Sequence, residues 1–176
     1  MRLPDDVLAE VFGHTCVSRL EIVSTYPPII SRDLPQCTLQ LVCKAWRSVI
    51  LSRPRLWSVI CLGGVFEAST AAVFTHQARL LELWLSRSKS YPLEIVLFFV
   101  HAPEDGDEDV VMAEALVIGK ILSVAGRWRS LSAQCHGRVM HQLGEVRPQI
   151  SVLILRLDSV ASESGIEYSI LRESAL

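Results

Sequence analysis

From residue 64 onward, segments that favour strands alternate with segments that favour helices, and this alternation restricts the possible folds more than any other feature of the chain. Residues 93–100 (LEIVLFFV) are short, apolar and rich in β-branched and aromatic side chains, which indicates a buried strand. Two later segments also read as strands, 128–135 (WRSLSAQC) and 150–157 (ISVLILRL). The segments that favour helices are 67–89, 109–125 and 137–145.

The clearest helix is expected at residues 67–89. Four of its apolar residues repeat at helical spacing: Phe74, Ala78, Leu81 and Leu85. Pro92 prevents this helix from continuing, because proline has no N–H to donate and clashes with the preceding turn. Further on, the acidic stretch 104–109 (EDGDED) leads into the next helix, for which Asp109 is the expected N-cap.

Alternation of this kind predicts a parallel sheet joined by right-handed crossovers. The expected strand centres near Ile95, Leu131 and Leu153 are unevenly spaced, which is typical of an irregular repeat similar to a short leucine-rich-repeat solenoid. We expect this region to occupy residues 65–176. No polar capping segment is recognisable after the last strand, so we expect the repeat array to be incomplete.

The first sixty residues have a different, mainly helical pattern. Residues 3–16 predict a short helix with Pro4 in its first turn, and residues 38–52 predict a second helix capped by Thr38. Prolines interrupt the intervening segment, 17–37, which reads as an insertion. Pro54 ends the second helix and starts a further turn that carries Leu56 and Trp57. A Gly-Gly pair at 63–64 marks the expected end of this module, at residues 1–62.

Three sequence elements of this module, taken in order, resemble the F-box family. The first is Leu3-Pro4-Asp5-Asp6-Val7-Leu8 followed by Phe12, the second is Leu41-Val42-Cys43-Lys44-Ala45-Trp46-Arg47, and the third is Pro54, Leu56-Trp57 and Val59-Ile60. The first element alone is a weak signal, whereas all three in order within sixty residues are specific. The segments 81–99 and 123–133 are also similar to the region that follows the F-box in fungal F-box proteins with degenerate leucine-rich repeats. The insertion at 17–37 is longer than the usual spacer of the family.

The resemblance implies an α+β fold, in which a small three-helix F-box is followed by leucine-rich-repeat-like helices and strands. It implies docking on the Skp-type adaptor of a cullin–RING ubiquitin ligase, with a protein substrate held by the downstream region and no chemistry performed by the chain itself. The positions that it assigns to adaptor contact are Leu3, Pro4, Val7, Leu8, Phe12, Leu41, Val42, Cys43, Trp46, Leu56 and Trp57. Three short helices bury little surface alone, so some of their apolar residues are expected to complete a partner's core.

Two details of the module have alternative interpretations. Trp46 either belongs to the core of the module or contacts the adaptor, and one ring can do both. The basic residues Lys44, Arg47, Arg53 and Arg55 form either a solvated face or a rim that steers an acidic partner. An F-box-derived interaction scaffold without ligase function, or an inactive fragment, is the alternative to a substrate receptor. An enzyme ranks last, because no constellation of catalytic residues is recognisable.

Composition argues against several other classes of protein. The net charge of −2 and the apolar stripe of residues 38–52 oppose nucleic-acid binding. The longest apolar run, 93–100, is far shorter than the roughly 20 residues of a membrane-spanning helix. The five cysteines are scattered without a metal-binding or disulfide pattern, which predicts reduced thiols and a cytoplasmic or nuclear location. No cofactor and no metal ion are expected, because the histidines, the acidic loop and the glycines match no binding motif.

Overall fold

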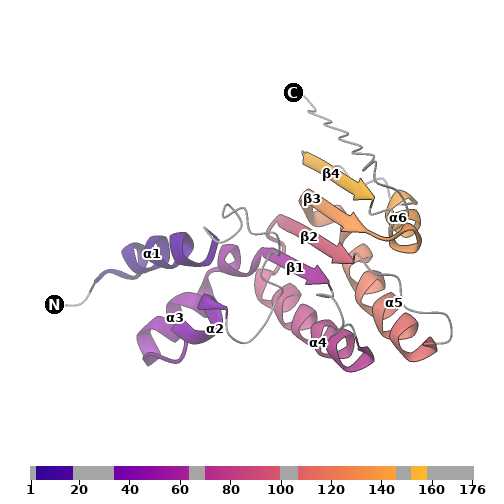
Figure 1. The fold of residues 1–176 in the computed structure, drawn as a ribbon. Coiled ribbons are helices and arrows are strands. Elements are labelled where there is room, and N and C mark those ends of the chain that lie inside the picture. The colour runs from indigo at the N-terminus through magenta and orange to yellow at the C-terminus, as the bar shows by residue number, and fades with distance from the viewer. Residues whose placement is uncertain (1–2, 18–33, 64–69, 100–106, 146–151, 158–176) are drawn as a thin grey trace, which may run out of the picture.

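The computed structural model describes residues 3–17, 34–63, 70–99, 107–145 and 152–157, the last for its backbone (Figure 1). Four parallel strands form one sheet in the order β1-β2-β3-β4, so that each strand lies beside its neighbour in the sequence. The strands are β1 Val59–Gly63, β2 Leu93–Phe99, β3 Trp128–Cys135 and β4 Val152–Leu157. The predicted mixture of helices and strands, and the parallel direction of the strands, are therefore confirmed.

A helix follows each of the first three strands and leads to the next one. These helices are α4 Ala71–Ser88, α5 Glu108–Leu122 and α6 Gly137–Gly144, with a short 3-10 turn, η3 Ala125–Arg127, before β3. The expected cap of α5 was wrong by two residues: Asp107 is the N-cap, and its side chain accepts a hydrogen bond from the Val110 N–H, whereas Asp109 lies inside the first turn. A run of acids offers several possible caps, and only the backbone geometry selects one of them.

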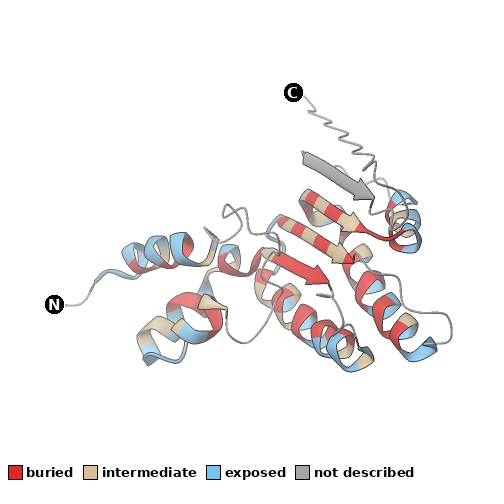
Figure 2. Ribbon diagram, in the orientation of Figure 1, coloured by how far each residue is buried: buried red, intermediate tan, exposed pale blue. Residues whose placement is uncertain are grey.

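The hydrophobic core lies between the sheet and helices α4 and α5 (Figure 2). Along β2, Leu93, Ile95, Leu97 and Phe99 are buried, while the residues between them are only half-buried. The rings of Phe74 on α4 and Phe99 on β2 stack with their centroids 5.7 Å apart. The alternation in β2 shows that one face of the sheet is covered more fully than the other, because side chains along a strand point to opposite faces.

The N-terminal helices lie at the β1 end of the sheet (Figure 1). They are α1 Asp5–Val17, α2 Pro35–Leu39 and α3 Lys44–Ser52, followed by the 3-10 turn η2 Pro54–Trp57. The single helix predicted at 38–52 was therefore wrong, because residues 40–42 form a turn between two helices. Thr38 lies within α2, and Cys43 occupies the N-cap position of α3 without a side-chain cap bond.

The predicted insertion at 17–37 is shorter at both ends than expected. Val17 belongs to α1, and Pro35 opens α2 at a position where its missing N–H costs nothing. Of the expected insertion, residues 18–33 lie outside the described part of the chain.

Strand β1 joins the N-terminal helices to the sheet. It immediately follows η2 and pairs in parallel with β2, with Gly63 opposite Phe98. Gly63 has a φ of 155°, and a Cβ atom there would lie 2.0 Å from the Phe98 carbonyl oxygen, so the two strands approach closely only because residue 63 is glycine. The buried side chain of Gln77 on α4 accepts a hydrogen bond from the Gly63 N–H (3.2 Å) and donates one to its carbonyl oxygen (2.5 Å).

Trp57 lies where the helical segment meets the sheet. Its ring is completely buried and packs edge-on against Trp84 of α4, with centroids 5.0 Å apart. Its Nε1–H donates to the Ile50 carbonyl oxygen of α3 (3.0 Å), and the Arg87 guanidinium lies 4.2 Å above the ring. The N-terminal helices and the helix–strand region consequently share one hydrophobic core.

Candidate protein-docking surface

Helix α1 has one apolar face that is buried and another that is exposed. Leu8 and Phe12 are buried against the rest of the chain, where α1 packs on α2, α3 and η2. Leu3, Val7 and Val11, spaced four residues apart, remain 45–54% exposed. Because residues four apart lie on the same side of a helix, Val7 and Val11 form an apolar stripe, and Leu3 continues its spacing just ahead of the helix.

The turn between α2 and α3 adds two further exposed apolar side chains. Leu41 is 78% exposed and Val42 is 61% exposed, and Cys43 beside them is also exposed. Hydrogen bonds from the N–H groups of Leu41 and Val42 to carbonyl oxygens three residues earlier, 3.0 and 3.3 Å long, hold the turn. These side chains extend the exposed apolar surface of the N-terminal helices.

Trp46 links the buried and exposed parts of this surface. It is half-buried, and its ring meets Phe12 edge-on at 5.0 Å with an interplanar angle of 62°. One side of the ring therefore packs on α1 and some of its surface stays accessible, so the core part of the Trp46 alternative is observed and contact with a partner stays a prediction.

The structure separates the eleven residues assigned to adaptor contact into two groups. Leu3, Pro4, Val7, Leu41, Val42 and Cys43 are exposed and Trp46 is half-buried, whereas Leu8, Phe12, Leu56 and Trp57 are buried in the chain's own core. The last four present almost no surface in this structure, so their contact with a partner stays a prediction. Val11, which is not among the positions assigned to adaptor contact, is exposed one turn after Val7, and its spacing of four residues was the signal available in the sequence.

The charged residues around this surface are mostly exposed. Arg53 forms an ion pair with Asp6 and so ties the end of α3 to α1. Lys44, Arg47 and Arg55 are also exposed. Exposed ion pairs of this kind add little to stability, so the basic residues are better suited to influence association than folding.

The described residues hold no cluster of three or more side chains able to bind a metal ion. The most unusual polar pair is His136 and Glu114, both buried, with Nε2 and Oε2 3.1 Å apart. This contact joins the start of α6 to the middle of α5, and the His136 N–H also donates to the Phe99 carbonyl oxygen (2.7 Å). The pair satisfies buried polar groups where three elements meet, which is a structural role.

The chemistry of the cysteines agrees with reduced thiols. All five lie within the described segments, and no disulfide links any two of them. Burial raises the pKa of the Cys61 thiol to about 12. Burial, with a smaller contribution from the nearby Cys37, raises that of Cys16 to about 11. Among the described helices, none is both long enough and apolar enough to cross a bilayer.

No protein-family model, curated protein or solved structure matches the chain.

Proposed function

We propose that this chain is the substrate-recognition subunit of a Skp–cullin–F-box type ubiquitin ligase. The proposal rests on one observation: apolar residues at positions of the F-box motif are exposed to solvent. Val7, Leu41 and Val42 are large apolar residues that a folded chain ordinarily buries, yet they are exposed at positions that the F-box resemblance assigns to adaptor contact. Interfaces of this kind are built from apolar side chains that would otherwise face water.

The helix–strand region that begins at β1 suits the other task of such a subunit, which is to bind a protein substrate. Parallel strands added in chain order, the first three each followed by a helix, resemble a short leucine-rich-repeat array, which would present a rigid surface to a protein substrate. A receptor of this type performs no chemistry of its own. It raises the local concentration of substrate lysines near a charged ubiquitin-conjugating enzyme. The buried Trp57 would hold the docking helices in a fixed position relative to that array.

The proposal is tested by titrating the purified chain with a purified Skp-type adaptor in a calorimeter. The informative variant is the double substitution Val7→Glu with Leu41→Glu, since both side chains are exposed and neither change should unfold the protein. We expect affinity to fall at least about a hundredfold, as is typical when anchor residues of an interface are replaced. Leu116→Glu, an equally non-conservative change at an exposed leucine of α5, is the matched control and should bind normally.

Failure of the unaltered chain to bind the adaptor would refute the proposal, as would equal affinities for the double variant and the control. A reconstituted ligase then separates a receptor from a scaffold. Cullin-dependent ubiquitin transfer to a bound partner supports the receptor, whereas adaptor binding without transfer favours the scaffold.

A further inference from the structure

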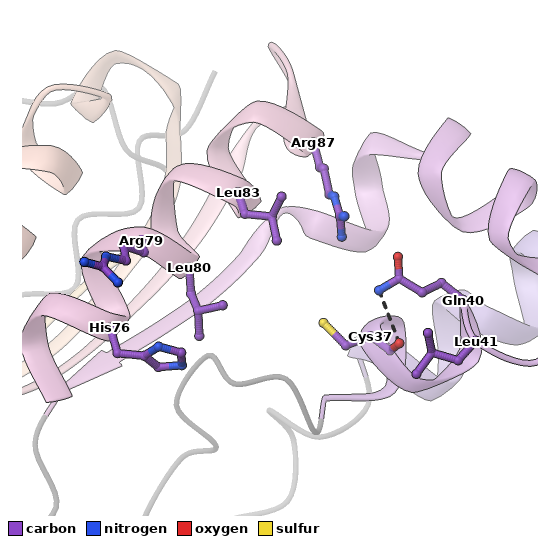
Figure 3. A pocket seen from close by; sticks show the side chains of 8 residues that line it. All are labelled: Cys37, Gln40, Leu41, His76, Arg79, Leu80, Leu83 and Arg87. Atoms are coloured by element: carbon purple, nitrogen blue, oxygen red, sulfur yellow. Dashed lines mark hydrogen bonds between the residues drawn. The ribbon is translucent and has the colours of Figure 1, made fainter. Parts of the chain in front are cut away.

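A groove of about 510 Å³ separates α2 from α4 and lies outside the surface described above, except for one shared residue (Figure 3). The residues that line it are Cys37, Gln40, Leu41, His76, Arg79, Leu80, Leu83 and Arg87. Leu41 is the shared residue and forms part of the α2 side. A cavity of this volume is within the range that accommodates a small ligand or a few side chains.

One stripe of α4 forms the longer wall of the groove. His76, Leu80, Leu83 and Arg87 follow one another at spacings of four, three and four residues, which places them on a single helical face. In Figure 3 the His76 ring and the Arg87 guanidinium extend toward the α2 side. On that side, Gln40 Nε2 donates to the Cys37 carbonyl oxygen (3.2 Å), which fixes the amide beside Arg87. The leucines on both sides give the groove apolar walls.

The charges of the groove are all of one sign. Two of its lining residues are arginines, Arg79 and Arg87, and none of the described lining residues is acidic. Arg47 on α3 is a third cation nearby. Burial lowers the pKa of Arg87, the nearby Cys37 opposes that shift, and the positive charge of Arg47 adds to it. The groove therefore concentrates positive charge on a chain whose net charge is −2.

Arg87 has a donor that its surroundings leave unused. Its guanidinium is anchored over the Trp57 ring, with Cζ 4.2 Å from the ring centroid. Its Nη1 is buried, and no hydrogen-bond acceptor among the described residues reaches it. Nη1 itself has almost no accessible surface, but Arg87 as a whole is only partly buried and lines the groove, so the remainder of its guanidinium, held in place by packing, can bind a carboxylate through charge-assisted hydrogen bonds.

We propose that this groove binds a short segment of a partner protein in which an Asp or Glu carboxylate lies next to an apolar side chain. The carboxylate pairs with Arg87, while Arg79 supplies further positive charge, and the apolar side chain packs between Leu41, Leu80 and Leu83. A nucleic acid fits less well, because the leucines offer nothing to a phosphate backbone and the cations are few. The inference does not depend on the proposed ligase role.

The test begins with a display library of short random peptides selected on the immobilised full chain. A parallel selection uses the variant His76→Glu with Arg79→Glu, both exposed positions. We expect peptides selected only by the unaltered chain to carry Asp or Glu beside Leu, Ile or Phe. A fluorescein-labelled peptide from that group should lose at least about tenfold in affinity when its acids are changed to Gln or Asn, because the change removes a charged partner of the guanidinium.

Variants of the chain give the complementary measurement by fluorescence anisotropy. His76→Glu with Arg79→Glu should weaken the same peptide by about tenfold or more, through repulsion of its carboxylates. Arg138→Glu on α6 reverses the charge of one arginine at an exposed site away from the groove, as the Arg79→Glu part of the groove variant does within it, and should change affinity less than about twofold. Arg87→Lys keeps the charge but loses the planar fork of donors, so it should also weaken binding, and circular dichroism will show whether that variant remains folded.

Four results of the experiments with unmodified peptides would overturn the inference. They are a selection that yields no binders, a selection without enrichment of acidic residues, equal binding of the Gln- or Asn-substituted peptide, and an effect of Arg138→Glu as large as that of the groove variant. Binding only when a phosphoserine replaces the carboxylate would also refute it and indicate a phosphopeptide site instead. Adaptor affinity is measured separately with the α4 variants, in which Leu41 is unchanged, so the groove and the docking surface are assessed independently.

Discussion

Replacing Trp57 with phenylalanine tests whether this tryptophan is a core residue that joins the two regions or an anchor for a partner. The ring is fully buried, and its Nε1–H donates to the Ile50 carbonyl oxygen. Phenylalanine preserves an aromatic ring but lacks this donor and is smaller. We expect the lost hydrogen bond to cost about 1 kcal/mol and the space left by the smaller ring to cost ~1 kcal/mol more.

The assay is urea unfolding followed by far-ultraviolet circular dichroism, because removing a tryptophan alters the fluorescence signal itself. A loss of about 2 kcal/mol corresponds to a fall of roughly 1 M in the urea midpoint for a denaturant slope of about 2 kcal/mol/M. We also expect helix and strand signals to be lost in one transition, since Trp57 contacts both α3 and α4. Trp46→Phe is the matched control, and its half-buried ring should change the midpoint by less than half as much.

Two results would refute this reasoning. If Trp57→Phe and Trp46→Phe shift the midpoint equally, burial does not distinguish the two tryptophans. If Trp57→Phe leaves the midpoint unchanged but weakens adaptor binding, the ring is an interface residue and the shared core is not what holds the regions together.

Three further predictions concern single residues. Gly63→Ala should destabilise the protein by about 2 kcal/mol or more in thermal unfolding, because its Cβ would lie 2.0 Å from a backbone oxygen of β2. Gly119→Ala, in open space on α5, should instead stabilise it by about 0.5–1 kcal/mol, and equal effects would contradict the explanation. Asp107→Ala should cost about 1 kcal/mol through loss of the α5 cap, which urea unfolding would detect. In native protein at about pH 8, iodoacetamide should label the exposed Cys43 well before the buried Cys61, since only the thiolate reacts and burial raises the pKa of Cys61 to about 12; comparable rates in peptide mass spectrometry would exclude this.

The strands and helices after residue 64 were predicted well because their signals are local. The segment 93–99 is apolar except for Glu94 and contains β-branched and aromatic side chains, and 128–135 was predicted with the observed boundaries. The wrong prediction of a single helix at residues 38–52 also comes from relying on a local signal. Apolar residues at helical spacing continue through the turn at 40–42, so periodicity by itself did not reveal that the chain changes direction there.

The sequence by itself determined the type and order of the elements, because periodicity, prolines and glycines act over a few residues. It did not determine which apolar residues face water. Val7 and Leu8 are neighbours of similar hydrophobicity, yet one is exposed and the other is buried. Only the tertiary structure decided this, as it decided that Trp57 completes the core and that Arg87 lies in a basic groove. Burial depends on contacts between residues far apart in the sequence, which a local pattern does not contain.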